Sequence, residues 1–384
     1  MDNAPSHLPV TIMRGGTSKG VFIRDDLLPA PGTERDALLL RLMGSPDPMQ
    51  LDGLGGTWSS TSKVVAVVPS ACPGIDVDYR FAQVGIETAT VDETGNCGNL
   101  ASAVGPYAVD SGFVAPVEPT TTAVLRNLNT GAVIRSSFPV VDGRAATAGD
   151  QMIAGVPTPG PRIVNEYIDP TGTIFGTVFP TGKRLDHVAV DGCQVTVSVV
   201  DVVHTVAFVK AGELGIDPSS GPPELNADAA SVDRAERLRA ACAALLPTHR
   251  ASSNLPRLVL LRDGSTGSAA MLDVIGTSAG RFHHALPVTS ILCTAAAAVL
   301  EGTLPFQMAS SRPAIDGDGI GSVQIHHPKG EVEATVRLGD SGDVTAVGIV
   351  RTARRLMDGT AYLRLATHRE AYDDASPDLE ESDV

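Results

Sequence analysis

The chain contains 384 residues, a length that predicts two domains. Its formal net charge is −15, and only 4% of its residues are aromatic. An acidic protein with few stacking side chains is not suited to bind nucleic acid or an anionic membrane, so neither partner is expected. The first residues show neither the basic nor the apolar segment of a secretory leader, and we therefore expect a cytoplasmic protein.

The five cysteines are far apart and odd in number, which argues against a disulfide framework and against zinc-site spacing. The sequence contains neither a phosphate-binding loop nor a dinucleotide fingerprint. We therefore expect no metal and no cofactor. Residues 373–384 carry six carboxylates and no basic residue, which predicts an acidic, disordered tail.

Short β-branched runs alternate with a few helical patterns along the chain. In the first half, helices are expected at 33–43, capped by Thr33, and at 98–110. The second half repeats this arrangement, with helices expected at 227–246 and 287–300. Strands are expected at 62–68, 123–126, 132–138, 173–179, 187–190, 193–201, 205–210, 257–262, 270–275, 322–327, 331–338 and 344–352.

Two of the predicted helices are apolar on every face, at residues 100–109 and 290–300. A helix of this kind is enclosed by other elements. Each half therefore predicts a set of strands wrapped around its own central helix. The boundary between the halves is expected near Thr181 and Gly182, where a strand-like run ends in a turn.

Two glycine-rich polar clusters lie next to short apolar runs: residues 14–20 follow the run 10–13, and residues 53–63 lead into the expected strand at 62–68. Residues 14–20 are small enough for backbone N–H groups to turn toward an anion, and Arg14 and Lys19 add positive charge. Residues 53–63 place five hydroxyls before Lys63 at the head of a strand, where partial burial favours the neutral amine that acts as a base. A β-turn with solvated cations and a Ser/Thr-rich loop with a snorkelling lysine remain the alternatives.

A third polar cluster, residues 95–99, places Cys97 directly before a helix. Unpaired N–H groups and the positive end of the helix dipole stabilise a thiolate at such a position. The other four cysteines lie in or beside apolar segments, which is typical of small buried side chains. We therefore favour a reactive thiol at Cys97, with a buried structural cysteine as the alternative.

The two central helices differ at their starts. Counted back from the glycine that ends each helix, Pro287 stands in the second half where Cys97 stands in the first. Arg281, His283 and His284 lie just upstream of Pro287. This favours one catalytic thiol in the first half and a second half that holds a negatively charged substrate, with ordinary packing or capping by the histidines as the alternative.

Ser60 and Lys63 also match the Ser-x-x-Lys pattern of serine acyl hydrolases. In those enzymes the pattern begins a helix, whereas here a β-branched run follows and no Lys-Thr-Gly appears. A serine hydrolase is therefore not favoured.

Several long motifs, in the same order, resemble those of the PrpF family. The family includes 2-methylaconitate cis-trans isomerase, 4-oxalomesaconate tautomerase and related Δ-isomerases. The resemblance spans nearly the whole chain. The matching motifs lie at residues 13–20, 43–47, 60–64, 95–100, 179–182 and 283–285.

The resemblance implies a diaminopimelate-epimerase-like α/β (α+β) fold with two pseudo-symmetric domains and an active site in the cleft between them. The domains are expected at 1–183 and 184–343, with 344–365 crossing back to the first. It also implies that Lys63 and Cys97 form an acid/base pair, assisted by Ser18, which acts on an unsaturated tricarboxylate without a cofactor. Substrate contacts are expected from Arg14, Gly15, Gly16, Thr17, Ser60, Thr61, Ser62, Asn96, Gly98, Asn99, Arg281, His283 and His284.

The chemistry of an aconitate-like substrate suits these residues. Removal of a proton from its CH₂ group by Lys63 or Cys97 gives an extended dienolate, in which the original double bond gains single-bond character. Rotation followed by reprotonation gives cis-trans isomerisation, and reprotonation at another carbon moves the double bond. Backbone N–H groups of the glycine-rich loops would stabilise the developing charge.

The particular substrate and some alternatives stay open. Lys183, Lys329 and the segment 201–205 differ from what is common in such folds, and all three fall where the second domain would touch substrate. The activity is expected on 2-methylaconitate, with 4-oxalomesaconate tautomerase or an aconitate or methylitaconate Δ-isomerase as alternatives. A racemase would need a second, opposed thiol, and a non-catalytic small-anion binding protein is the alternative outside enzymes. A homodimer is an open option.

Overall fold

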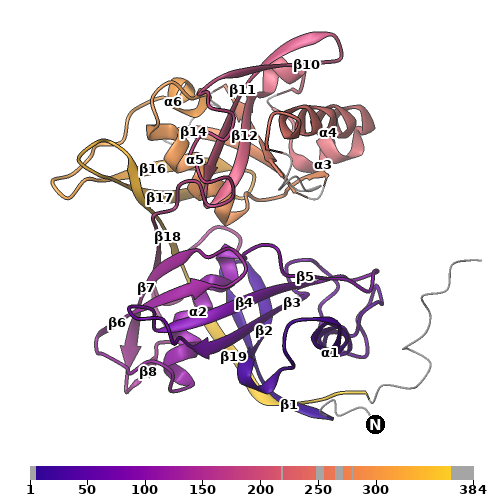
Figure 1. Ribbon diagram of the computed structural model, residues 1–384, viewed down its shortest axis with the longest axis vertical. Helices are drawn as coiled ribbons and strands as arrows, with labels where there is room; N and C mark the ends of the chain where they lie inside the picture. Colours follow the sequence, from indigo (N-terminus) through magenta and orange to yellow (C-terminus); the bar gives the residue numbers. More distant parts are fainter. Residues whose placement is uncertain (1–5, 218, 248–254, 264–270, 279, 365–384) are drawn as a thin grey trace, which may run out of the picture.

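The computed structural model describes residues 6–217, 219–247, 255–263, 271–278 and 280–364. The two halves of the chain form two lobes of mixed α/β structure, stacked along the long axis (Figure 1). The elements of the first half are β1 (His7–Gly15), β2 (Ser18–Arg24), η1 (Asp25–Leu27), α1 (Thr33–Met43), β3 (Lys63–Pro69), β4 (Val77–Val84), β5 (Val91–Asp92), α2 (Gly98–Asp110), β6 (Thr120–Asn127), β7 (Val133–Val141), β8 (Arg144–Ala145) and β9 (Ile163–Ile168). Those of the second half are β10 (Asp186–Val190), β11 (Cys193–Val202), β12 (His204–Lys210), η2 (Ala211–Leu214), α3 (Pro222–Ala227), α4 (Ala229–Ala243), β13 (Arg257–Arg262), β14 (Leu272–Ser278), β15 (Arg281–Phe282), α5 (Val288–Val299), α6 (Leu304–Met308), β16 (Ile320–His327), β17 (Gly330–Leu338), β18 (Val344–Arg351) and β19 (Ala353–Tyr362).

The strands of the two lobes belong to one continuous hydrogen-bonded sheet. In the first lobe the neighbours run β19, β1, β2, β3, β4, β6, β7 and β9. In the second they run β18, β17, β16, β14, β13, β12, β11 and β10. The antiparallel pair of β9 and β18 joins the two series.

The two halves repeat the same topology. In each, a strand that follows a tight turn pairs in parallel with a later strand, with the register Val21 to Val64 in the first half and Val206 to Arg257 in the second. In each, the central helix begins six positions after a two-residue strand ends. The quasi-equivalence of the halves therefore matches Cys97, directly before α2, with Pro287, directly before α5, as the sequence predicts.

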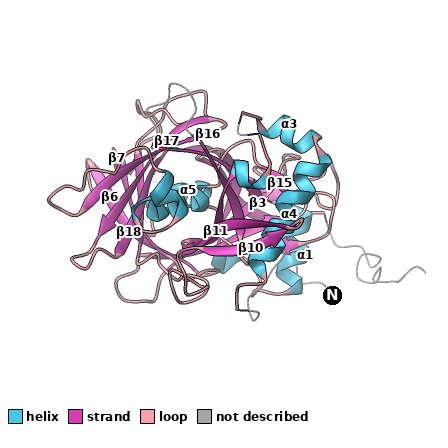
Figure 2. Cartoon of the chain, turned by 90° about the horizontal axis from the view of Figure 1, so that it is seen from above, coloured by secondary structure: helices cyan, strands magenta, loops and turns pink. Residues whose placement is uncertain are grey.

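The central helices α2 and α5 are buried along almost their whole length. In α2 only Asn99 and Asp110 are not buried, and the helix continues through Pro106. In α5 only Val299 is not buried. Figure 2 shows α5 inside a ring of strands. The two helices meet at their N-termini, where the single hydrogen of Gly98 faces Val288.

The chain crosses from the second lobe back to the first at Thr352. The strand before this residue, β18, pairs with β17 and β9, and the strand after it, β19, pairs with β1 (Figure 1). Within the segment expected to return to the first domain, β18 therefore borders both lobes and β19 lies in the first. The carbonyl of Thr352 accepts hydrogen bonds from the backbone N–H of Gly16 (2.9 Å) and from Nη1 of Arg14 (3.0 Å), which ties the first glycine-rich cluster to the crossing.

The expected strand at 173–179 is wrong, because this segment is a loop of turns. The backbone N–H groups of Ile174 and Phe175 donate to the carboxylate of Asp201 at 2.9 and 2.7 Å, so they do not enter a strand ladder. The strand that precedes this loop is β9, along which buried and partly exposed side chains alternate. In α1, the residue before the helix is Gly32, so Thr33 begins the helix rather than capping it. The predicted acidic tail, 373–384, lies outside the described residues.

Gly98→Ala should test the contact between the central helices. The added Cβ would lie 2.6 Å from Cγ1 of Val288 and 3.2 Å from the hydroxyl of Tyr167. We expect the thermal midpoint to fall by the equivalent of about 1–3 kcal/mol, because overpacking a closed contact strains both helices. Combining the change with Val288→Ala should cost less than the two single changes together.

Gly212→Ala is the matched control, because a Cβ at Gly212 would have no neighbour within 4 Å. An unchanged midpoint in Gly98→Ala, equal to that of the control, would show that the helices do not meet as closely as described.

Candidate active site

Cys97 stands at the N-cap of α2, in extended backbone conformation. Its Sγ lies 3.9 Å from Oγ of Ser18, the first residue of β2. Ser18 is buried, and Cys97 is partly exposed. The folding of β2 beside the start of α2 therefore brings together two of the three residues expected to carry the chemistry.

The first and third glycine-rich clusters pack directly on each other. A Cβ at Gly16 would lie 2.1 Å from Oδ1 of Asn99, and one at Gly15 would lie 2.5 Å from the Asn99 carbonyl oxygen. Gly16 also has a positive φ of 50°. Nδ2 of Asn99 donates to Oγ1 of Thr17 at 3.1 Å. Glycine is required here because the backbone of the β1–β2 turn touches the start of α2.

Lys63 heads β3 with a side chain that is only 9% exposed. Its Nζ donates to Oε1 of Gln83 and lies 5.0 Å from the ring centroid of Phe81. The amide nitrogen of Gln83 donates in turn to the carbonyl oxygens of Ser59 (3.2 Å) and Ser62 (2.8 Å). The lysine amine is thus held by a side chain that is itself fixed by the cluster before the strand.

The second half contributes His283 and Arg257 to the same neighbourhood. Burial lowers the pKa of His283, and the positive charges of Arg257 and Lys63 lower it further. Burial also lowers the pKa of Arg257 to about 10, while a thiolate at Cys97 opposes this shift. Arg257 therefore stays protonated near neutral pH, and it interacts electrostatically with Cys97, as His283 does with Lys63.

Arg257 was not among the residues expected in the site. It is the first residue of β13, as Lys63 is the first residue of β3, so the quasi-equivalence of the halves was the signal that could have found it. Its Nη1 donates to Oγ1 of Thr289 at 2.6 Å, and no carboxylate of the described residues pairs with it. By the same relation His204, the first residue of β12, matches Ser18, and burial lowers the pKa of His204 well below its ordinary value.

Two neutral phenols flank Cys97 and Asn96. The hydroxyl of Tyr79 donates to Oδ1 of Asn96 at 3.1 Å. Burial raises the pKa of both Tyr79 and Tyr167, and a thiolate at Cys97 would raise both further. The side chain of Asn96, the residue before Cys97, is therefore held in place by the buried Tyr79.

Three hydroxyls expected to touch substrate differ in their surroundings. The carbonyl oxygen of Ser60 accepts the backbone N–H of Lys19 at 2.9 Å. Oγ1 of Thr61 donates to the Gly56 carbonyl at 2.8 Å. The Ser62 hydroxyl is fully buried and donates to a backbone carbonyl of β4 at 3.0 Å. Thr61 and Ser62 thus use their hydroxyls to hold the loop before Lys63 rather than to face a substrate.

Arg14 makes its hydrogen bonds inside the protein. Its Nη1 donates to the carbonyl oxygens of Gly16 and Thr352 and to Oγ1 of Thr352, each at 3.0 Å. Burial and the nearby Arg354 lower its pKa. Arg14 therefore holds the β1–β2 turn at the strand crossing through Nη1.

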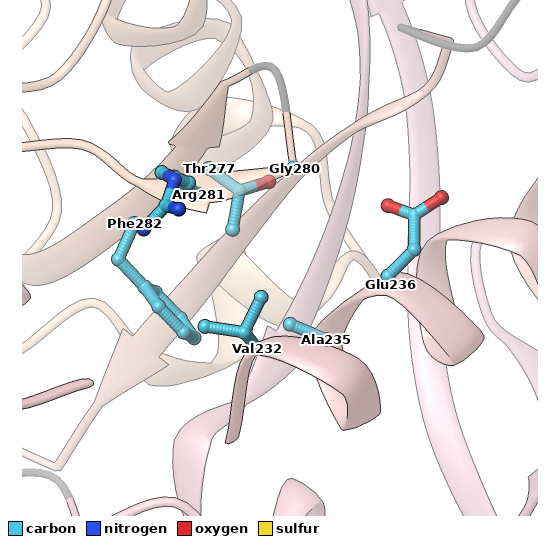
Figure 3. Close-up of a pocket in the computed structure, with 7 residues that line it drawn as sticks. All are labelled: Val232, Ala235, Glu236, Thr277, Gly280, Arg281 and Phe282. Atoms are coloured by element: carbon cyan, nitrogen blue, oxygen red, sulfur yellow. The ribbon is translucent and has the colours of Figure 1, made fainter. Parts of the chain in front are cut away.

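Arg281 lies apart from the other predicted residues. Figure 3 shows it beside Thr277, in a pocket whose opposite wall is formed by Val232 and Ala235 of α4. The pocket volume is about 10 Å³, which leaves room for about one water molecule and not for a tricarboxylate. Of the basic residues before α5, His283 is partly buried, and the exposed His284 stacks on it with ring centroids 4.5 Å apart.

The fold is that of the diaminopimelate-epimerase-like class, two quasi-equivalent halves that each enclose a central helix. A solved hydroxyproline epimerase shares the fold, with a TM-score of 0.57 at 11% identity over 93% of this chain and 92% of that one. The model of the family described as PrpF protein matches residues 6–364. The chain belongs to the PrpF family.

Named relatives support this assignment over the full length. The 3-methylitaconate isomerase of Eubacterium barkeri is 36% identical, with 94% of this chain and 98% of that protein covered. The 2-methyl-aconitate isomerase of Shewanella oneidensis is 33% identical, with 91% and 95% covered. A crystal structure of methylitaconate-delta-isomerase has a TM-score of 0.79 at 35% identity, with 93% and 95% covered.

Within the described residues, no helix is both long and apolar enough to span a membrane. The same part of the chain holds no group of three or more His, Cys, Asp or Glu side chains placed to bind a metal ion.

His327, at the end of β16, predicts a pH dependence of stability. Burial, with the charge of Arg351 adding to it, lowers the pKa of His327 to about 4, whereas an unfolded histidine titrates near about 6.5. Between these pH values the unfolded chain binds the extra proton, so stability should fall as the pH falls from about 6.5 to about 4. Thermal midpoints measured across this range should show a shallower fall in His327→Gln. The exposed His187→Gln should keep the wild-type slope, and equal slopes in all three proteins would contradict the assignment.

Proposed function

We propose that this protein is a cofactor-independent isomerase that moves an allylic proton on an unsaturated tricarboxylate such as 2-methylaconitate. The reaction takes place where the N-termini of α2 and α5 meet. Lys63 and Cys97 form the acid/base pair, and Ser18 assists the thiol.

The proposal is supported by the packing of Cys97 beside Ser18 at the start of α2, and by the electrostatic interactions of Cys97 with Arg257 and of Lys63 with His283. A thiol at a helix N-terminus and a nearly buried amine are both suited to proton transfer. Arg257 faces them without a carboxylate partner among the described residues. A negatively charged substrate would supply that partner.

The proposed reaction needs no group besides these side chains. One member of the Lys63–Cys97 pair takes a proton from the carbon next to the double bond, and the electron pair spreads through the double bond into a carboxylate. The resulting dienolate is stabilised by Arg257 and by the N–H groups at the start of α2. Return of a proton to the same carbon after rotation gives the cis-trans isomer, and return to the other end of the allylic system gives the Δ-isomer.

The relatives' names support an unsaturated acid but differ in its number of carboxylates. 3-Methylitaconate has two carboxylates and 2-methylaconitate has three, and the corresponding relatives are similarly distant from this chain. We favour the tricarboxylate because two cations, Arg257 and Arg351, have no carboxylate partner among the described residues.

The acid/base pair is tested by proton exchange in D₂O. Wild-type protein with 2-methylaconitate, 3-methylitaconate or 4-oxalomesaconate should lose the allylic proton signal in NMR as deuterium enters. Cys97→Ser and Lys63→Gln should slow this exchange by about 10²- to 10⁴-fold, the usual contribution of a general acid or base. The substrate exchanged fastest identifies the branch of the family.

Cys193→Ser is the matched control for the thiol, because Cys193 is exposed and lies on β11. Exchange at the wild-type rate in Cys97→Ser would remove Cys97 from the mechanism. If the wild type bound these acids but exchanged none of them, a small-anion binding protein would replace the isomerase.

Arg257→Gln should weaken substrate binding. We expect KM to rise by about 10- to 100-fold, the loss typical of a charge-assisted hydrogen bond, with a smaller rise in Arg257→Lys. Steady-state kinetics would measure both. Arg237→Gln, an exposed change on α4 that breaks a pair with Asp191, is the control and should leave KM unchanged. An unchanged KM in Arg257→Gln would place this cation outside the binding site.

A further inference from the structure

A second polar cavity adjoins the proposed site at the strand crossing. It has a volume of about 180 Å³ and lies between the loop before β9, the β16–β17 hairpin and the end of β18. Its polar lining residues are Gln151, Arg162, His327, Glu331, Glu333 and Arg351. The volume is sufficient for a carboxylate with bound water.

Arg351 is a buried cation that pairs with no carboxylate of the described residues. Its side chain is only 8% exposed. Its one hydrogen bond within the described chain runs from Nη1 to the carbonyl of the preceding residue, Val350, at 3.0 Å. Burial lowers its pKa to about 10, so it is still protonated at neutral pH. A buried charge is costly unless it is paired, and this one lines an open cavity.

Two other residues that line the cavity can help to bind an anion. Nδ1 of His327 accepts the backbone N–H of Lys329 at 3.2 Å, which leaves the proton of the neutral ring on Nε2 as a donor. Arg162 is exposed at the rim and adds a second positive charge. Glu331 and Glu333 are also exposed at the rim, where water screens their charge, and Glu333 accepts a hydrogen bond from Ser322 at 2.6 Å.

The cavity borders the first glycine-rich cluster. Ala154 lines the cavity, and a Cβ on the next residue, Gly155, would lie 3.0 Å from Cγ2 of Thr17. Thr17 directly precedes Ser18, whose Oγ lies 3.9 Å from Sγ of Cys97. The cavity is therefore next to the turn that packs beside the thiol.

We propose that Arg351, with Arg162 and the Nε2–H of His327, forms a subsite for the substrate carboxylate most remote from the reacting carbon. Arginine binds such a group through two parallel hydrogen bonds. The subsite distinguishes tricarboxylates, which fill it, from dicarboxylates, which leave it empty. The inference rests on the proposed function for the position of the other two carboxylates.

Steady-state kinetics with a tricarboxylate and a dicarboxylate test the subsite. Arg351→Gln should raise KM for 2-methylaconitate by about 10- to 100-fold, with a much smaller change for 3-methylitaconate. Arg351→Lys should recover part of the loss, and Arg162→Gln should change KM in the same direction by less. A purely structural role would raise both KM values alike or lower kcat for both substrates, and either result would overturn the proposal.

Binding of unreactive acids separates the subsite from the reaction. Tricarballylate, a saturated tricarboxylate, should bind the wild type more tightly than glutarate in calorimetry, and Arg351→Gln should abolish the difference. Arg237→Gln is the control and should keep it. If wild-type protein prefers tricarballylate but turns over no unsaturated acid, the proposed reaction fails while the subsite stands. If Arg351→Gln is folded by circular dichroism and keeps the preference, the subsite fails while the reaction can stand.

Discussion

The contact between Gly98 and Val288 is the constraint on which the other features of the molecule depend. It joins the starts of two buried helices, one from each half, and leaves no room for a Cβ on the first. The sheet that runs through both lobes holds the helices in this position, because β9 and β18 pair directly and the chain crosses at Thr352. Residues placed near either helix start, such as Cys97 and His283, are thereby brought to one place.

The halves have the same topology but opposite chemistry at this place. The first supplies a thiol, a hydroxyl and an amine at Cys97, Ser18 and Lys63, whereas the second supplies Pro287 and Arg257 at matching positions. A proline cannot exchange a proton, and an arginine remains charged near neutral pH even where burial lowers its pKa to about 10. The second half thus supplies a permanent cation at the position that matches Lys63, and the buried imidazole of His204 at the position that matches Ser18.

The sequence predicted those features that depend on local geometry. The glycine-rich cluster at 14–20 stood out because small residues let backbone N–H groups turn toward an anion, and Cys97 stood out because a helix start favours a thiolate. The packing of Gly16 on Asn99 at the start of α2 became visible only in the structure. Arg257 and Arg351 did not stand out, because a basic residue at a strand end usually lies at the surface and only the register of β13 and β18 buries it. The burial of the Ser62 hydroxyl was not visible in the sequence for the same reason, since it depends on a hydrogen bond to Val84 of β4.

The uneven division of chemistry between the lobes has a stereochemical consequence. Both members of the proposed acid/base pair, Lys63 and Cys97, come from the first lobe, so they approach a substrate held against the second lobe from one side. A proton removed and returned under these conditions uses a single face of the planar dienolate. Transfer would be suprafacial, and a portion of the abstracted hydrogen could return to the product before it exchanges with solvent. An epimerase with a thiol on each lobe has no such bias.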